Sequence, residues 1–162
     1  MPSPYAPTPE DKKHLVAAVE LAALARKGGN HPFGALLVLD GEAVLTAGNT
    51  VVTEQDATGH AETNLVRLAT RAYTREQLAG ATLYTSTEPC AMCAGAVYWS
   101  GIGRVVYALG EDELLALTGA SEENPTMALP CREVFAAGQR AVRVSGPCLY
   151  EEAVAVHEGF WN

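Results

Sequence analysis

The first apolar pattern in the chain has helical spacing. Thr8 can cap a helix, and Pro9 suits the first helical position because it has no backbone N–H to satisfy. The apolar positions that follow are Leu15, Val16, Val19, Ala22 and Ala23. The pattern stops at Gly28-Gly29, so the sequence predicts a first helix up to that point. We expect residues 1–8 to form a flexible tail before it.

Two apolar runs separated by a turn signal come next. The runs are Gly34–Leu39 and Glu42–Gly48, and Asp40-Gly41 lies between them. An Asp-Gly pair suits a type I′ turn, which matches the twist of two antiparallel strands. The sequence therefore predicts a β-hairpin.

Helical and strand patterns then alternate. Helices are predicted from about His60 to Tyr73 and from Cys90 to Ser100, with strands at Ala81–Thr87 and Arg104–Leu109. This alternation is typical of α/β units, so we expect a mixed sheet covered by helices on both faces. Beyond Gly110 the pattern predicts a short helix over Asp112–Leu117, a helix near Arg132–Ala137, a strand over 141–145 and a helical segment over 149–161.

Length and composition indicate one globular domain over residues 1–162. The chain has 162 residues, of which 48% are hydrophobic, and it contains no internal repeat or linker. Its N-terminus lacks the pattern of a secretory signal, and no apolar run reaches the length of a membrane span. We therefore expect a cytoplasmic protein that does not enter a membrane.

The charge balance disfavours a nucleic-acid partner. Lys and Arg number 11 against 19 Asp and Glu, which gives a formal net charge of −8. Such a surface repels a phosphate backbone unless a basic patch is built locally. A small molecule is the favoured partner.

Two short motifs place metal-binding groups at the starts of predicted helices. His60 and Glu62 begin one helix, and Cys90 and Cys93 begin another directly after Pro89. A helix N-terminus stabilises thiolate, which is the form that binds zinc. His60, Cys90 and Cys93 would then hold Zn2+ and leave the fourth tetrahedral position for water, as catalytic zinc sites do. Glu62 would accept and pass on protons beside the metal.

Two other interpretations of the cysteines are weaker. The Cys90–Cys93 spacing alone also suits a redox pair of the thioredoxin kind, but the upstream histidine and glutamate favour a metal. A structural zinc site needs a fourth protein ligand. The remaining candidates do not stand at a paired spacing: His14, His31, His157, Cys131 and Cys148.

The combination of His60-Ala61-Glu62 with Glu88-Pro89-Cys90 and Cys93 resembles the cytidine deaminase superfamily, over roughly residues 10–110. This resemblance implies a three-layer α/β/α fold around a five-stranded mixed sheet. It also implies bound zinc and a homodimer or larger assembly.

The resemblance further implies substrate contacts. The Pro32–Ala35 segment and the Tyr98-Trp99 pair look like those of bacterial guanine deaminases, which makes Phe33 a candidate for lining the pocket. Family members use an asparagine at the position of Asn49 to bind the ring, with the backbone N–H of Ala61 beside it. The remaining candidates are one of Glu111, Asp112 and Glu113 for an amine of the substrate, and Phe160 and Trp161 for closing the pocket, from the same chain or a partner.

One position departs from the family pattern. Gly59 precedes His60 where relatives commonly have alanine, and we expect it to loosen the loop that enters the helix.

The function expected from these residues is zinc-dependent hydrolytic deamination of a free nucleobase or nucleoside, which releases ammonia. Guanine, giving xanthine, is the leading substrate. The alternatives are a transfer-RNA adenosine deaminase, a deaminase of cytosine, isocytosine, cytidine or guanosine, and a non-catalytic zinc module.

Overall fold

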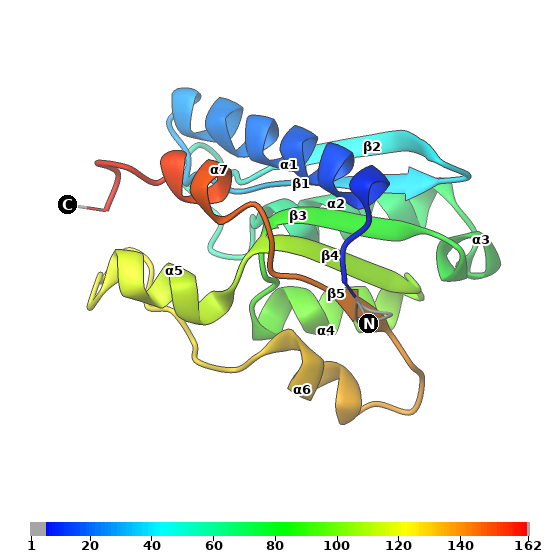
Figure 1. Cartoon of the computed structure of the whole chain (residues 1–162). Coiled ribbons are helices and arrows are strands. Elements are labelled where there is room, and N and C mark those ends of the chain that lie inside the picture. Colours follow the sequence, from blue (N-terminus) through cyan, green and yellow to red (C-terminus); the bar gives the residue numbers. More distant parts are fainter. Residues whose placement is uncertain (1–5, 162) are drawn as a thin grey trace.

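The structure, a computed structural model, describes residues 6–161 and has a five-stranded sheet between layers of helices (Figure 1). The strands lie in the order β2-β1-β3-β4-β5. β2, β1 and β3 pair antiparallel, whereas β3, β4 and β5 pair parallel. The expected three-layer fold with a five-stranded mixed sheet is therefore confirmed.

The first helix, α1, spans Pro9–Lys27 and begins where the sequence predicts. The Thr8 hydroxyl accepts the Asp11 N–H at 3.1 Å, and the Asp11 carboxylate accepts the Thr8 N–H at 2.9 Å. This reciprocal pair satisfies two backbone donors that a helix start leaves free. Of the tail expected to be flexible, residues 1–5 lie outside the described part of the chain, and Thr8 is fixed in this cap.

The hairpin consists of β1, Gly34–Leu39, and β2, Glu42–Gly48. Asp40 and Gly41 have φ values of 52° and 79°, as a type I′ turn requires. Gly34 has another role, because a Cβ there would come within 2.5 Å of the Ala22 backbone nitrogen. The missing side chain lets α1 pack directly on β1.

The middle of the chain contains three helices and two strands: α2 (Ala61–Ala72), α3 (Arg75–Ala79), β3 (Thr82–Thr87), α4 (Ala91–Ser100) and β4 (Arg104–Leu109). The short helix α3 was not predicted. Its signal is nevertheless in the sequence, because Thr74 and Gln77 form a capping box.

The last third contains α5 (Glu111–Thr118), α6 (Cys131–Ala136), β5 (Arg143–Ser145) and α7 (Tyr150–Ala155). The predicted helix over 149–161 was too long. The chain turns after Ala155, and Gly159 adopts a φ of 70°, which lets the final aromatic residues fold back. None of the helices in the described part, residues 6–161, is long and apolar enough to cross a membrane.

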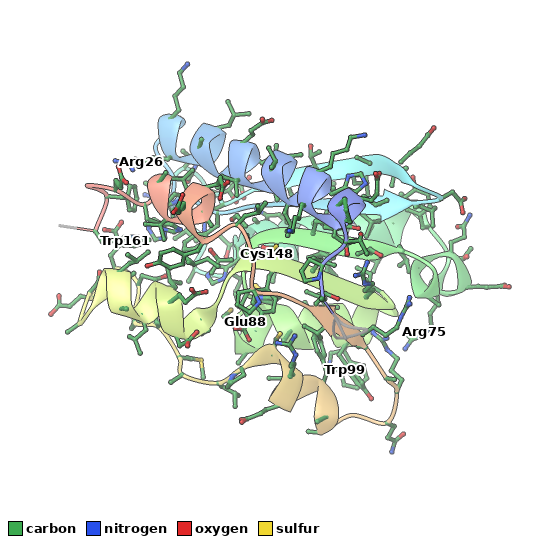
Figure 2. All side chains as sticks on the ribbon, in the orientation of Figure 1. Arg26, Arg75, Glu88, Trp99, Cys148 and Trp161 are labelled. Carbon is green, nitrogen blue, oxygen red and sulfur yellow. The ribbon has the colours of Figure 1, made fainter. Side chains whose placement is uncertain are left out.

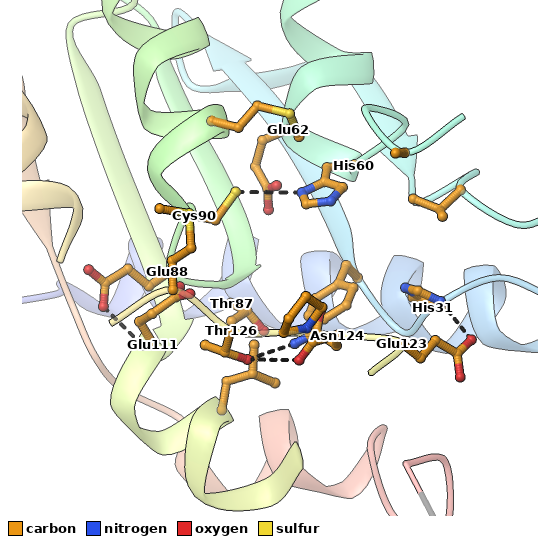
Figure 3. Close-up of a pocket in the computed structure, with 17 residues that line it drawn as sticks. His31, His60, Glu62, Thr87, Glu88, Cys90, Glu111, Glu123, Asn124 and Thr126 are labelled. Atoms are coloured by element: carbon orange, nitrogen blue, oxygen red, sulfur yellow. Dashed lines mark hydrogen bonds and ion pairs between the residues drawn. The ribbon is translucent and has the colours of Figure 1, made fainter. Parts of the chain in front are cut away.

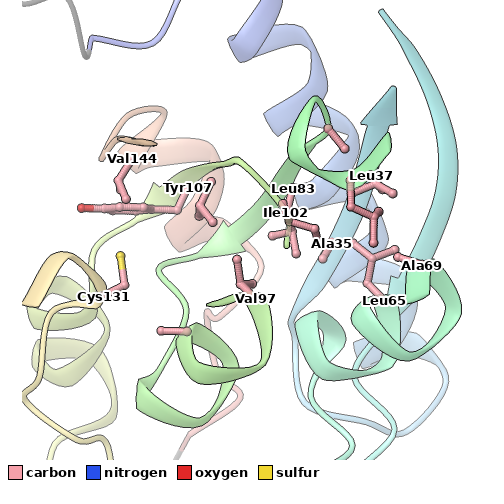
Figure 4. Packing of buried hydrophobic residues seen from close by; sticks show 14 of the residues in the cluster. Ala35, Leu37, Leu65, Ala69, Leu83, Val97, Ile102, Tyr107, Cys131 and Val144 are labelled. Atoms are coloured by element: carbon pink, nitrogen blue, oxygen red, sulfur yellow. The ribbon is translucent and has the colours of Figure 1, made fainter. Parts of the chain in front are cut away.

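Alternation along the strands divides the core into two clusters, one on each face of the sheet. Ala35 and Leu37 of β1 face the cluster formed with α2, α4 and α6, part of which Figure 4 shows. Leu36 and Val38 face the opposite cluster with α1 and α7. Because successive strand residues point to opposite faces, both sides of β1 are apolar.

An ion pair between a buried carboxylate and a partly exposed guanidinium connects α1 to the sheet. The Asp11 carboxylate accepts hydrogen bonds from Arg104 Nη1 and Nη2 of β4, both at 2.8 Å, and from the Tyr84 hydroxyl of β3 at 2.7 Å. Arg104 also donates to the Ser145 hydroxyl of β5 at 3.0 Å. One carboxylate thus joins a helix start to three adjacent strands.

Candidate active site

The potential metal ligands occupy equivalent positions at two helix starts. His60 is the N-cap residue of α2 and Cys90 is the N-cap residue of α4, and neither side chain makes a capping hydrogen bond. Cys93 lies on the first turn of α4 and is fully buried. Side chains that would cap a helix in other proteins are therefore free to bind a ligand between the two helix starts.

These three side chains converge closely enough to hold one ion. The Sγ atoms of Cys90 and Cys93 lie 3.6 and 3.4 Å from His60 Nδ1, and all three donor atoms lie within 4.8 Å of one another. One nitrogen and two sulfur donors form a set that suits zinc, and three protein ligands are typical of a catalytic site. The residues present fit Zn2+.

The pKa values of the Cys90 and Cys93 thiols are shifted in opposite directions. The hydrogen bond from Cys93 outweighs burial and lowers the pKa of Cys90 to about 4, and a hydrogen bond with His60 adds a smaller lowering. The same hydrogen bond and burial raise the pKa of Cys93 well above its usual value. Cys90 therefore loses its proton more readily than Cys93, and metal binding would displace the proton that Cys93 retains.

Glu62 lies beside the ligands on the first turn of α2 and is only 5% exposed. Burial raises the pKa of its carboxyl, and the hydrogen bond that Thr85 donates to Oε1 at 2.5 Å opposes this effect. Thr85, on β3, was not singled out from the sequence. Strand alternation places its side chain on the sheet face that α2 covers, and it holds the Glu62 carboxyl in position.

A cavity of about 380 Å³ opens next to the ligands (Figure 3). His60, Glu62 and Cys90 line it on one side. The loop between α5 and α6 lines the other side, and the His31 ring contacts Glu123 of that loop through a 2.9 Å hydrogen bond. The remaining lining residues are Phe33, Val51, Ala57, Thr87, Glu88, Met92, Glu111, Leu114, Asn124, Pro125, Thr126 and Met127.

Among the three acidic candidates that follow β4, the structure brings one to the cavity. Glu111 lines it and is 6% exposed. Asp112 is exposed, and the Glu113 carboxylate accepts the Gly110 N–H at 2.8 Å as part of a helix cap. Burial and the nearby Cys90, Glu88 and Glu62 raise the pKa of Glu111 to about 8. A divalent cation at the three ligands would lower this pKa again by adding positive charge.

Glu88 is a buried residue of the cavity that the sequence reasoning missed as a site residue. One carboxylate oxygen accepts the backbone N–H of Glu111 at 3.0 Å, and the other accepts that of Cys131 at 2.8 Å. These groups start α5 and α6, which flank the cavity loop. Glu88 therefore fixes both ends of the segment that carries Glu111.

The C-terminal aromatic residues lie against the cavity wall in the same chain. The Trp161 ring is 6.1 Å from Phe33 and 5.4 Å from His31, although Trp161 itself does not line the cavity. Trp161 Nε1 donates to His157 Nδ1 at 3.0 Å, and burial lowers the pKa of His157 to about 4, so this ring stays neutral. Phe160 packs on Trp161 and lies under Arg26 of α1.

Asn49 and Ala61 are buried near the site but are not among the cavity-lining residues. Asn49 Oδ1 accepts the Val51 N–H at 3.0 Å, which shapes the loop after β2. The expectation that Gly59 loosens this region was wrong. A Cβ at Gly59 would come within 2.8 Å of the Thr50 hydroxyl, and the Gly59 carbonyl accepts the Thr50 N–H at 2.8 Å, so glycine allows a tight approach.

Comparisons with known proteins identify the family. A family model described as the cytidine and deoxycytidylate deaminase zinc-binding region matches residues 8–109. The chain belongs to this family of zinc-dependent deaminases, and it is a zinc-dependent hydrolase.

Relatives within the family carry different specificities. The chain is 40% identical over 153 residues to a "probable cytosine deaminase" of Schizosaccharomyces pombe. The matched region covers 94% of this chain and 93% of the relative. It is 41% identical over 98 residues to a Bacillus subtilis tRNA-specific adenosine deaminase, covering 60% of this chain and 61% of the relative. A structure of guanine deaminase from Nitrosomonas europaea superposes with a TM-score of 0.74 at 27% identity, over 96% of this chain and 85% of that one.

Proposed function

We propose that the protein deaminates a free nucleobase by hydrolysis and releases ammonia. The observation that carries this proposal is the charge of the cavity. Its lining includes Glu62, Glu88, Glu111 and Glu123, and none of the described residues that line it is Lys or Arg. Such a cavity repels phosphate groups, whereas an uncharged ring with N–H donors can enter and pair with the carboxyls.

Cytosine and guanine are the two bases to test first. Guanine is the leading substrate from the sequence motifs, and it is supported by a structural neighbour named guanine deaminase. Cytosine is supported by the relative named "probable cytosine deaminase", whose similarity extends through the last third of this chain. That third contributes Glu111 and the cavity loop, so similarity there bears on substrate choice more directly than similarity around the metal ligands.

In this proposal each residue of the site has a separate role in the reaction. His60, Cys90 and Cys93 would hold zinc, which when bound would supply a hydrolytic nucleophile at neutral pH. Glu62 accepts one proton of the attacking water and passes it to the ring nitrogen. It then takes the proton of the hydroxyl that has been added to the ring and delivers it to the amine, so that the product carries a carbonyl and ammonia leaves. Glu111 accepts a hydrogen bond from an N–H of the ring edge, and Phe33 packs against the ring, with Trp161 behind it.

The test is ammonia release by zinc-loaded protein. We expect turnover of cytosine or guanine, and no turnover of a transfer-RNA anticodon stem-loop at equal concentration, because the acidic cavity and a net charge of −8 oppose RNA binding. Turnover of the stem-loop alone would overturn the proposal. Cytidine and guanosine belong in the same assay, since they show whether a ribose is tolerated.

We also propose that the protein forms a homodimer through the exposed face of α4. Trp99 is 75% exposed on this helix (Figure 2), and Met92 is 38% exposed seven residues earlier, on the same helix face. A large exposed aromatic beside a second apolar side chain is typical of an interface. Met92 also lines the cavity, so a partner bound there would lie next to its entrance.

We expect Trp99→Glu to convert the dimer into a monomer, because a charge at the centre of an apolar interface is left without a partner. Light scattering of the wild type should give twice the mass of the chain, and the variant should give the mass of one chain. Tyr150→Glu is the matched control, because Tyr150 is half exposed on another helix and its variant should remain dimeric. A monomeric wild type would contradict the proposal.

A further inference from the structure

Thr87 is a buried hydroxyl residue that the proposed reaction does not yet use. It ends β3, is 3% exposed and lines the cavity next to the metal ligands. Its Oγ1 atom has no hydrogen-bond partner within residues 6–161. Two histidine nitrogens share this property, on His14 and His157, but neither residue lines the cavity. Among the described residues that line the cavity, Thr87 is therefore the one with a buried side-chain polar atom that makes no hydrogen bond.

Strand geometry places Thr87 between the reacting groups and the proposed ring-binding carboxyl. Thr85 and Thr87 point to the same face of β3 because they are two residues apart, and Thr85 contacts Glu62. Thr87 is also the register partner of Leu109 on β4, two residues before Glu111. Figure 3 shows Thr87 and Glu111 on the same wall of the cavity.

The other hydroxyl in the cavity wall has a structural partner. Thr126 accepts a hydrogen bond from Asn124 Nδ2 at 2.7 Å and so shapes the loop that carries both residues. Thr87 has no comparable contact. A buried hydroxyl without a partner is destabilising, and valine would fill the same space without this cost. A molecule that enters the cavity can supply the missing partner, because rotation about χ1 exchanges the hydroxyl and the methyl group.

We propose that Thr87 is a specificity-determining residue that donates a hydrogen bond to a ring oxo oxygen of the substrate. The inference rests on the proposed function. Cytosine and guanine both contain a ring N–H next to a carbonyl. Glu111 accepts from the N–H and Thr87 donates to the carbonyl, so the two side chains match both atoms of this amide edge. Adenine has no oxo oxygen, so it offers Thr87 no carbonyl acceptor at this edge.

The pairing also separates the two candidate bases. Counted from the carbon that loses its amine, the N–H and the carbonyl stand at different ring positions in cytosine and in guanine, so one fixed pair of side chains matches only one of them, although the cavity of about 380 Å³ has room for either ring. Adenine presents neither the ring N–H nor the carbonyl of this edge, so both side chains lose the partner that they match, and such a mismatch discriminates more strongly than shape.

The experiment compares substrates with and without the oxo oxygen. The pairs are cytosine with 4-aminopyrimidine and guanine with 2-aminopurine, assayed with the wild type, Thr87→Val and Thr87→Ser. Each analogue lacks the neighbouring ring N–H as well as the oxo oxygen, so the contribution of Thr87 is the change in preference between the wild type and the variant. We expect the preference of kcat/KM for the oxo substrate to fall about 10-fold in Thr87→Val, the size of one hydrogen bond, and to be largely retained in Thr87→Ser. Thr82→Val, at the other end of β3, should leave the preference unchanged because Thr82 does not line the cavity.

Each outcome separates this inference from the proposed function. If wild-type protein turns over an oxo base but Thr87→Val keeps the same preference, Thr87 does not bind the oxo oxygen and the inference is wrong. If the preference falls equally in Thr87→Ser, the side chain acts through its volume and the inference is also wrong. If the wild type deaminates no base, the proposed function itself fails and the inference fails with it. The ratio is measured within each variant, so partial loss of folded protein does not alter it.

Discussion

Glu62→Ala is expected to lower kcat by about 10²–10⁴-fold while the zinc content stays at one ion per chain. The carboxyl is buried beside the three ligand side chains and is held by Thr85, so no water-exposed group can replace it at that point. It does not belong to the group of three donor atoms that converge on the metal position. Its removal should therefore stop proton transfer without releasing the metal.

The measurement combines ammonia release with zinc analysis of the same preparation. Glu62→Gln keeps the size and the contact with Thr85 but cannot accept a proton, and it should be as inactive as Glu62→Ala. Glu76→Ala removes an exposed glutamate on α3 and should have wild-type activity. Full activity of Glu62→Ala would instead support a non-catalytic zinc module or a different proton-transfer group.

Asp11→Ala is expected to lower the free energy of unfolding by about 2–3 kcal/mol, because it leaves the partly exposed Arg104 guanidinium without its carboxylate. The Tyr84 hydroxyl and the Thr8 N–H lose an acceptor at the same time. Urea denaturation of the zinc-loaded protein would measure the change. Glu20→Ala, which removes an exposed carboxylate from the same helix, should differ little from the wild type.

The contribution of Asp11 to stability should also depend on pH in a defined direction. Burial raises the pKa of its carboxyl, but hydrogen bonds from Arg104, Thr8 and Tyr84 outweigh burial and lower it well below its usual value of 3.8. The folded state therefore binds the proton less tightly than the unfolded state. This contribution is complete above the usual pKa and is lost as the pH falls further. The difference between wild type and Asp11→Ala should shrink below about pH 4, and a constant difference would contradict this interpretation.

The elements that the sequence predicts well are those whose signals are local. The cap at Thr8, the Asp40-Gly41 turn and the alternating helices and strands need only neighbouring residues, and each was found within one or two positions. The short helix α3 was missed because five residues carry too little apolar periodicity to be recognised without the cap. The final helix was extended too far because its apolar residues serve a distant contact, between Trp161 and Phe33, and not a helical face.

The site residues show the same difference between local signals and contacts that are distant in the sequence. His60, Glu62, Cys90 and Cys93 were found through motif spacing, since each pair lies within one helical turn. Glu88 and Thr87 were not singled out, because their roles depend on residues that are distant in the sequence, such as Cys131 and Leu109. The choice of Glu111 over its two neighbours likewise needed the direction in which α5 leaves β4.

Glu88 has a consequence for how specificity can change within this fold. The family model ends at residue 109, yet Glu111 and the loop of the cavity lie beyond it. Glu88, next to the metal ligands, receives the first backbone N–H groups of the two helices that border this later segment. In the proposed function, Glu88 therefore joins the metal-binding part of the cavity to the later segment that supplies Glu111 and the cavity loop. A different segment grafted onto this junction would change one part of the base-binding surface, whereas Phe33 and Thr87 would remain in place.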